Sequence, residues 1–473
     1  MTETADPSSI ADPSSVVGRP ARAARRAPAD LPFTFADRGL VEALAAGRAE
    51  PAWLLEDRLA ALALFEALPV ESSQLYTPYV DLRAASLEAA VPYVVTGAAA
   101  ATTAAGLPDG VAGLLELRED GVTVAALSDE ARAAGVRLLT LGEMVAADEP
   151  LARELLTGGA ALPSDDKLAQ LSLAAWTQGV LVRVPAGVRL DQPIVVRWAV
   201  GAPRSVIGRT LIVLGDGAEA SVVEELVASD GVVSGSQALL CATTEIRLGA
   251  HARLAMASLQ ETGPDQVVFQ QRRAEIGEAA DLRWALAQLG ARLVRSRVDN
   301  VLAGDRSTVE QVEIVFGSDD QLHDLTSYTR HVGRDTTGQL LSKGVLMDRA
   351  RTYMKGLIQI EKTAIGTDSF LGEFGMNLSK SARAVAIPSL EIDQPDCRRA
   401  AHSSSVGPID ETQLFYLESR GIPPDDARKF IVLGFLEPVV ARVPLEEARD
   451  RLREALEAKW NAGVAGSGAV SAA

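Results

Sequence analysis

The chain has 473 residues, of which 47% are hydrophobic and 4% aromatic, and its formal net charge is −17. This length suggests about three domains and a large core. The acidic balance and the few aromatic rings argue against nucleic-acid binding, which needs basic grooves and stacking platforms. Two cysteines cannot form a disulfide framework, and the first residues lack the pattern of a signal peptide, so we expect a cytoplasmic protein. The longest uncharged stretch, 91–107, is mostly Ala, Gly and Thr and predicts no membrane span.

The N-terminal part divides into a tail and an α/β region. Residues 1–30 repeat "ADPSS" and then carry several arginines, which predicts a disordered, solvated tail rather than a targeting peptide. Residues 31–165 mix helical and strand-like runs. The first ordered element expected there is a helix that begins at Pro51 and ends at Pro69. Its apolar stripe consists of Leu55, Leu59, Leu62 and Phe65.

Residues 166–408 predict a mainly β architecture, because short Val/Ile/Leu-rich runs alternate with Gly, Asp and Ser. A similar pattern, a turn glycine followed by a small and then an aliphatic residue, recurs in "GAEASV" at 217, "GAHARL" at 249, "GEAADL" at 277 and "GDRSTV" at 304, with a degenerate copy, "SARAVA", at 381. The spacing favours a solenoid, specifically a parallel β-helix, over a propeller, whose repeats exceed about 40 residues.

Helical patterns return in residues 409–460. Asp410 can cap a first helix with Gln413 at its third position, and Gly421 can end it in a left-handed conformation. Residues 461–473 predict a flexible tail. Helices that follow a β-helix either cap it or recruit a partner, and the pattern alone leaves both open.

Chemical motifs are mostly missing. The chain has no P-loop, dinucleotide fingerprint, GxSxG elbow, HExxH or CxxC, so any nucleotide hydrolysis must come from another chain. Cys241 lies in an apolar run and is expected to be a buried, inert thiol. His251 follows a turn and is expected to be exposed. His323 and His331, eight residues apart, could share one face of a strand, and we interpret both as surface residues.

The segment "DCRRAAHSSS" contains Cys397 and His402, five residues apart. That spacing places the two side chains on opposite faces of a strand and about 140° apart on a helix. The pair therefore cannot chelate one ion by itself unless the segment is an irregular loop. A metal site here would need groups from distant sequence or from another chain.

Several segments resemble the SufB/SufD family of iron–sulfur cluster assembly proteins. They are "PSLEI" at 388–392, His402 followed by Val406-Gly407, "QLFYLESRGI" at 413–422, Ala427-Arg428, "GFLEPV" at 434–439, "LSKGVLMDRARTYMKGLIQI" at 341–360 and "AAWTQGVLVRVPAGVRLDQPIVV" at 174–196. The resemblance spans about residues 48–440. It implies a right-handed parallel β-helix flanked by an N-terminal α/β region and a C-terminal helical domain. It also implies a complex in which SufB and SufD pair through their β-helices and each binds a SufC ATPase through its C-terminal helices.

The arrangement of "LEI", the histidine and "QLFYL" is most similar to SufD. The segment 370–384 lacks the cysteine that SufB-type proteins carry before their last coil. By the resemblance, His402 matches the histidine of the family at the SufB interface. Cys397 is displaced from the Lys-Cys-Ser-His run of many SufD relatives, because Arg399-Ala400-Ala401-His402 stands there. The residues implied in docking the ATPase are Phe415, Tyr416, Arg420, Gly421 and Arg428.

The resemblance implies a non-catalytic scaffold subunit that binds no cofactor stably alone and shares a transient iron–sulfur cluster or iron with SufB. The chain has too few thiols for a four-cysteine site, which agrees with ligands supplied by a partner. One alternative is a SufB-like subunit that carries the nascent cluster itself. Another is an unrelated β-helix carbohydrate-active lyase or an acyltransferase, although neither clustered carboxylates nor a strict hexapeptide repeat is evident.

Overall fold

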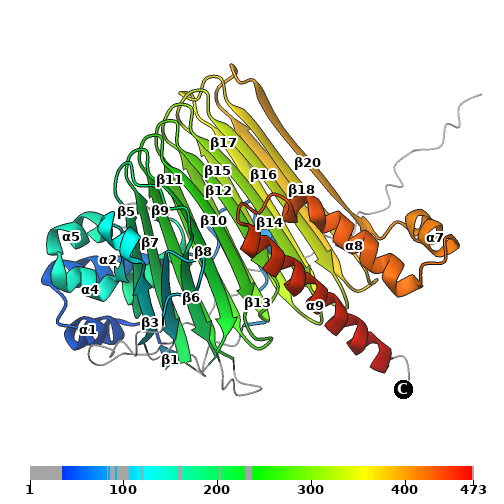
Figure 1. The fold of residues 1–473 in the computed structure, drawn as a ribbon, viewed down its shortest axis with the longest axis horizontal. Coiled ribbons are helices and arrows are strands. Elements are labelled where there is room, and N and C mark those ends of the chain that lie inside the picture. Colours follow the sequence, from blue (N-terminus) through cyan, green and yellow to red (C-terminus); the bar gives the residue numbers. More distant parts are fainter. Residues whose placement is uncertain are drawn as a thin grey trace, which may run out of the picture.

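A computed structural model describes residues 35–82, 84–85, 91–92, 106–118, 121–157, 162–201, 204–229 and 237–470. The predicted disordered tail at 1–30 lies outside these residues. The fold is mainly β, a long solenoid with helices packed near its N-terminal end and along one face (Figure 1). Within the described ranges, none of the helices combines the length and the hydropathy that crossing a bilayer requires.

The N-terminal region combines short helices with the first strands. Its elements are α1 (Arg38–Gly47), α2 (Ala52–Ala67), η1 (Thr77–Tyr79), β1 (Val91–Pro92), β2 (Gly113–Arg118), β3 (Gly121–Leu127), α3 (Asp129–Ala133), β4 (Arg137–Thr140), α4 (Leu141–Ala147), α5 (Glu149–Leu156) and α6 (Lys167–Ala175). The expected helix after Pro51 is α2, but the expectation that it comes first is wrong. Helix α1 precedes it, because the Asp37 side chain caps the helix by accepting a hydrogen bond from the backbone N–H of Leu40.

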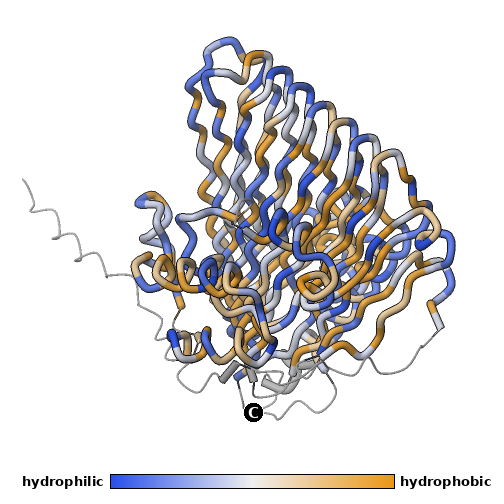
Figure 2. The backbone as a smooth tube through the Cα atoms, turned by 90° about the vertical axis from the view of Figure 1, so that its left-hand side faces the viewer, coloured by the Kyte–Doolittle hydropathy of each residue, from blue (hydrophilic) through white to orange (hydrophobic). Residues whose placement is uncertain are grey.

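Among the described residues, the solenoid has sixteen strands that alternate between two sheets. They are β5 (Gln178–Val184), β6 (Ile194–Val200), β7 (Arg204–Leu214), β8 (Glu219–Ala228), β9 (Leu239–Leu248), β10 (Arg253–Glu261), β11 (Val267–Ile276), β12 (Asp281–Gln288), β13 (Leu293–Leu302), β14 (Thr308–Gly317), β15 (Leu322–His331), β16 (Thr337–Leu346), β17 (Arg351–Ile360), β18 (Asp368–Asn377), β19 (Arg383–Ile392) and β20 (Arg399–Pro408). Odd-numbered strands form one parallel sheet and even-numbered strands the other. Figure 2 shows hydrophobic and hydrophilic residues alternating along the strands, as expected when one face of each strand lines a core.

The repeated glycine segments mark the turns that lead into the even-numbered strands. Gly277 and Gly304 lie against the preceding turn so closely that a Cβ would stand 2.6 Å from the Leu248 carbonyl oxygen and 2.1 Å from the Glu278 nitrogen, respectively. Two of the predicted copies are wrong. Leu254 pairs with Ala220, so the glycine equivalent to Gly249 is Gly215 rather than Gly217. The segment "SARAVA" opens β19, which belongs to the other sheet.

The C-terminal helices cover a face of the solenoid rather than its end. Helices α8 (Pro424–Val440) and α9 (Glu446–Val470) share a hydrophobic cluster with the outer face of the even-numbered sheet, where Leu436 and Trp460 are buried with Val312. Helix α9 continues to Val470, past residue 461, where the flexible tail is predicted to begin. Gly463 permits this path, since a Cβ there would lie 2.7 Å from the Met347 side chain.

The two histidines of β15 are buried, so the interpretation of both as surface residues is wrong. His331 Nδ1 lies 2.8 Å from Thr336 Oγ1, and its Nε2 lies 3.0 Å from Ser369 Oγ. Burial lowers the pKa of His331 to about 4 and that of His323 to about 3. The sequence pattern alone does not distinguish a buried strand with polar side chains from a surface strand. The hydroxyl groups that pair with His331 come from Thr336 and Ser369, which lie outside β15.

Candidate functional site

The C-terminal end of the solenoid is open. Strands β19 and β20 are the last strands of their sheets, and neither has a further neighbour in the part of the chain that the structure describes. Most residues of β20 are exposed, whereas β5 at the opposite end is almost entirely buried. Ile392 and Val406 are large apolar side chains that are 45% and 38% exposed at this end. Such edges offer unpaired backbone groups and apolar surface to another chain.

His402 lies in β20, beside Leu371 of β18 in the parallel register. Register partners in a parallel sheet point to the same face, and Leu371 is buried in the interior of the solenoid. The His402 side chain therefore points to the inner side of the sheet, yet it is exposed because it belongs to the last turn. The structure thus places an accessible imidazole at the open end.

The two cysteines lie apart from this imidazole. Cys397 is in the turn before β20 and packs, half-buried, against a small hydrophobic cluster that includes Ile360. Cys241 is fully buried in β9, where burial raises the pKa of its thiol and its Sγ lies 3.7 Å from the Leu168 carbonyl oxygen. Within the described residues, no three His, Cys, Asp or Glu side chains are grouped so that they could hold a metal ion. A metal at His402 would need ligands from elsewhere.

Two carboxyl groups are buried inside the last turns. Glu313 and Glu373 occupy the same inward-facing position on β14 and β18, with Ser342 between them in the register. The Glu373 carboxylate accepts a hydrogen bond of 3.0 Å from the Ile387 N–H, and a Cβ on Gly356 would stand 2.8 Å from its Oε1. Burial raises the pKa of Glu373 to about 8 and that of Glu313 to about 7, and their mutual repulsion adds to the shift at Glu373.

Helix α7 (Glu411–Ser419) projects beyond the sheets, and it buries none of its residues (Figure 1). Phe415 and Tyr416 on α7 and Phe430 on α8 are 71%, 56% and 61% exposed, and we call these three residues the aromatic patch. The Arg420 guanidinium lies 5.1 Å from the centre of the Tyr416 ring. Gly421 joins the two helices with φ 88°, a conformation that favours glycine. Exposed aromatic rings beside an arginine are typical of protein-binding surfaces.

Two open hollows flank the aromatic patch, with volumes of about 420 Å³ and 500 Å³. Tyr416 lines the first and Phe430 the second. Arg428 is also exposed, 4.0 Å from Asp425. Sequence reasoning missed Phe430. The helical spacing predicts that Phe430 is exposed. Phe430 precedes the buried Val432 by two residues, so its side chain points about 200° away from that of Val432 around the helix axis.

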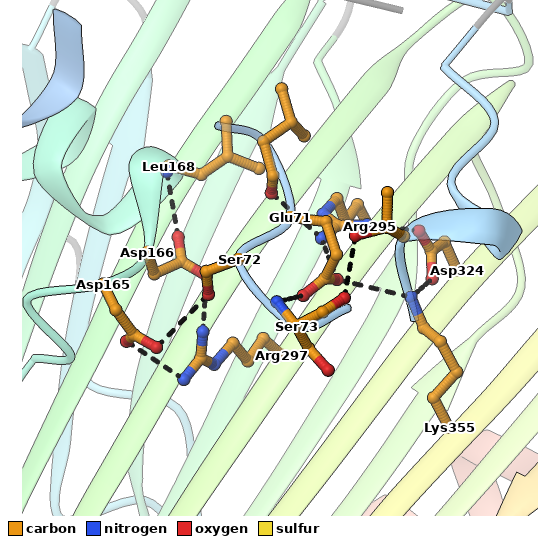
Figure 3. A network of polar contacts seen from close by, with 12 residues as sticks. Glu71, Ser72, Ser73, Asp165, Asp166, Leu168, Arg295, Arg297, Asp324 and Lys355 are labelled. Carbon is orange, nitrogen blue, oxygen red and sulfur yellow. Dashed lines mark hydrogen bonds and ion pairs between the residues drawn. The ribbon is translucent and has the colours of Figure 1, made fainter. Parts of the chain in front are cut away.

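A buried network of charges fixes the N-terminal region to the outer face of the odd-numbered sheet (Figure 3). Arg295 donates to the Glu71 carboxylate at 2.8 Å and pairs with Asp324, and Lys355 Nζ lies 2.5 Å from Asp324 Oδ1. Burial alone would raise the pKa of Asp324, but Lys355 and Arg295 hold it below the usual value. Two acids balance two bases, so the charges of this network compensate one another within the chain, and the network connects the N-terminal region to the sheet.

Comparisons with known proteins agree with this architecture. The family model "SUF system FeS cluster assembly, SufBD core domain" matches residues 198–435, which is half of the chain. An iron–sulfur cluster assembly SufBD family protein of Staphylococcus epidermidis (strain ATCC 12228) is 26% identical over 438 residues, covering 89% of this chain and 93% of the relative. The iron–sulfur cluster assembly protein SufD of Bacillus subtilis (strain 168) is 28% identical over 297 residues, covering 62% of this chain and 67% of the relative. The chain belongs to the SufB/SufD family of iron–sulfur cluster assembly proteins.

Proposed function

We propose that the chain is a SufD-like, non-catalytic scaffold subunit of an iron–sulfur cluster assembly complex in the cytoplasm. It pairs with a SufB-like protomer through the open end of its solenoid and with a SufC-like ATPase through α7 and α8. The observation that carries this proposal is the asymmetry of the solenoid, which is covered at one end and exposes β19, β20 and His402 at the other.

The open end fits a partner that is itself a β-solenoid. Edge strands that expose apolar residues are stable only when another strand or a covering element is added. A second solenoid meeting β19 and β20 would extend both sheets and bury Ile392 and Val406. Because His402 points to the inner side of β20, its imidazole would then lie at the junction of the two chains.

The side chains available at this junction suit a transient iron–sulfur cluster or iron that is shared between the two chains. Thiolates are the usual ligands of iron–sulfur clusters, with imidazole in some sites. This chain offers His402 but buries Cys241, so the SufB-like partner supplies most of the ligands. Cys397 lies five residues before His402 and is the weaker candidate, because its side chain packs against a hydrophobic cluster.

The aromatic patch suits the ATPase. Helix α7 buries none of its residues in the isolated chain, so its aromatic side chains remain available to a partner. Phe415, Tyr416 and Arg420 provide the anchoring side chains, while Gly421 and Arg428 shape the turn and the start of α8. ATP-driven movement of the partner would then reach the solenoid through α8, which is packed on the even-numbered sheet.

Anaerobic reconstitution with SufB-like and SufC-like partners tests the site. We expect His402→Ala to lower the yield of iron–sulfur cluster at least tenfold while the complex keeps its mass, because only a ligand is removed. His251→Ala, which removes another exposed histidine, is the matched control and should keep the wild-type yield. A wild-type yield from His402→Ala would show that this imidazole is not a ligand.

Co-purification tests the docking surface separately. Tyr416→Ala should reduce recovery of the SufC-like ATPase about tenfold or more, as truncation of a central aromatic anchor usually does. Leu75→Ala removes a comparably exposed apolar side chain, 51% exposed, from the N-terminal region and should leave recovery unchanged. Equal recovery with both variants would place the ATPase on another surface.

A further inference from the structure

A cavity of about 160 Å³ lies in the N-terminal region, far in sequence from β20. Residues of α2, of α6 and of the segment after α5 line it, together with Arg209 on β7. Its volume is several times the ~30 Å³ that one water molecule occupies in the liquid. The apolar part of the lining consists mainly of Leu54, Leu64, Leu156, Leu162 and Leu173.

Two polar atoms of the lining have no hydrogen-bond partner among the described residues. Arg209 is 2% exposed and donates through Nε to Glu245 at 2.6 Å, but its Nη2 is unpaired. The carboxylate atom Oδ2 of Asp57, on α2, is also buried and unpaired. A buried donor or acceptor without a partner costs about 1–3 kcal/mol, so both atoms favour a ligand that can satisfy them.

The chemistry of the lining narrows the class of ligand. A fatty acid could pair with Arg209 but would leave the Asp57 carboxylate unpaired. An amine would satisfy Asp57 and leave Arg209 unpaired. A phosphate dianion could pair with Arg209 but would offer Asp57 no cationic donor, and its two charges would be repelled by that carboxylate. A ligand with one anionic and one cationic group and an aliphatic part fits all of these features.

We propose that this cavity binds an aliphatic α-amino acid, whose carboxylate accepts from Arg209 Nη2, whose ammonium donates to Asp57 Oδ2 and whose side chain packs among the leucines. The charges around the cavity agree with a ligand of zero net charge, because both arginines are already paired with a carboxylate. Arg58, which also lines the cavity, pairs with Glu50 at 2.8 Å, and Arg209 pairs with Glu245. The site is independent of the open end of the solenoid and of the aromatic patch.

Calorimetric titration of the full chain with three related compounds tests the assignment. L-leucine carries both charges, 4-methylpentanoate lacks the ammonium, and 3-methylbutylamine lacks the carboxylate. We expect each analogue to bind at least tenfold more weakly than L-leucine, because each leaves one buried group unpaired. Equal affinity for L-leucine and either analogue would overturn the zwitterion assignment, and no heat of binding up to about 10 mM L-leucine would overturn the site.

One pair of variants and one single substitution separate binding from folding. Ala60→Trp fills the cavity from an exposed position on α2 and should abolish the binding of L-leucine, whereas Ala63→Trp, exposed on the same helix outside the lining, should not. Asp57→Asn should weaken the binding of L-leucine at least tenfold and leave the affinity for 4-methylpentanoate unchanged. Binding of L-leucine by Ala60→Trp at wild-type affinity would overturn the proposed location.

Discussion

The two ends of the solenoid differ in how they are finished. At the N-terminal end, the antiparallel strand β4 pairs with β5, strands β2 and β3 extend the even-numbered sheet, and α2 and α6 bury the outer face of the odd-numbered sheet. At the C-terminal end, β19 and β20 have no such cover among the described residues. A solenoid needs both ends protected to remain soluble. The covered end therefore accounts for stability, and the open end is where a partner is expected.

A matched pair of aromatic truncations measures this difference most directly. Phe65 on α2 is 4% exposed in the N-terminal core, whereas Phe415 on α7 is 71% exposed. Phe65→Ala should lower the free energy of unfolding by about 3–5 kcal/mol, because it leaves a cavity. Phe415→Ala should change it by less than about 0.5 kcal/mol. Urea unfolding of the isolated chain gives both values.

A large stability loss from Phe415→Ala in the isolated chain would contradict the difference between the two ends. It would mean that α7 contributes to the fold rather than to docking. The same two variants can then be compared in ATPase co-purification, where only Phe415→Ala should reduce recovery.

The carboxyl group of Glu373, buried near the open end, is expected to change the free energy of unfolding less than Phe65→Ala does, and its effect depends on pH. Burial raises its pKa from an ordinary 4.5 to about 8, so the folded chain holds a proton that the unfolded chain releases between these values. Stability contributed by Glu373 therefore falls as pH rises, by up to about 1.4 kcal/mol per pH unit, and the loss is complete above pH 8. Glu373→Gln, which keeps an acceptor for the Ile387 N–H, should remove this contribution.

The measurement is urea unfolding of wild type and variant between pH 6 and 9. The difference between the two proteins reports Glu373 together with its repulsion of Glu313, because uncoupled groups such as Lys459, whose pKa burial lowers to about 8, are common to both. Glu373→Asp keeps a carboxyl on the same strand and should retain a falling stability. A wild-type pH dependence in Glu373→Gln would show that this carboxyl is ionised in the folded chain.

Much of the solenoid could be predicted from the sequence, because its signals are local. Glycines at turn positions and β-branched residues between them predict strands, and α2 follows from its proline and its leucine spacing. The phase of the repeat could not be predicted. Gly217 matches the local pattern, but the register of β8 and β10 selects Gly215, and register depends on stacking between turns.

The candidate site was predictable to a different extent. The resemblance implied roles for His402 and for the docking residues Phe415, Tyr416, Arg420, Gly421 and Arg428, and these roles stay predictions. It did not show that β20 would be an uncovered edge. The sequence also could not predict that His323 and His331 are buried. Their burial depends on the position of β15 between β13 and β17 in the sheet. The exposure of Phe430 depends on which face of α8 packs on the sheet. Each of these properties is set by contacts between distant segments.

The smallest effect on folding is expected at the open edge itself. Ile392 is 45% exposed at the end of β19, so Ile392→Lys should change the free energy of unfolding of the isolated chain by less than about 0.5 kcal/mol. In a complex with a SufB-like protomer the same lysine would be buried at the junction without a partner, which costs several kcal/mol. We therefore expect at least a hundredfold weaker pairing in analytical ultracentrifugation, while Arg330→Lys, exposed on β15 away from the edge, keeps wild-type pairing. Wild-type pairing by Ile392→Lys would mean that the partner leaves the end of β19 uncovered. In that case only β20 would remain as the edge that the partner covers.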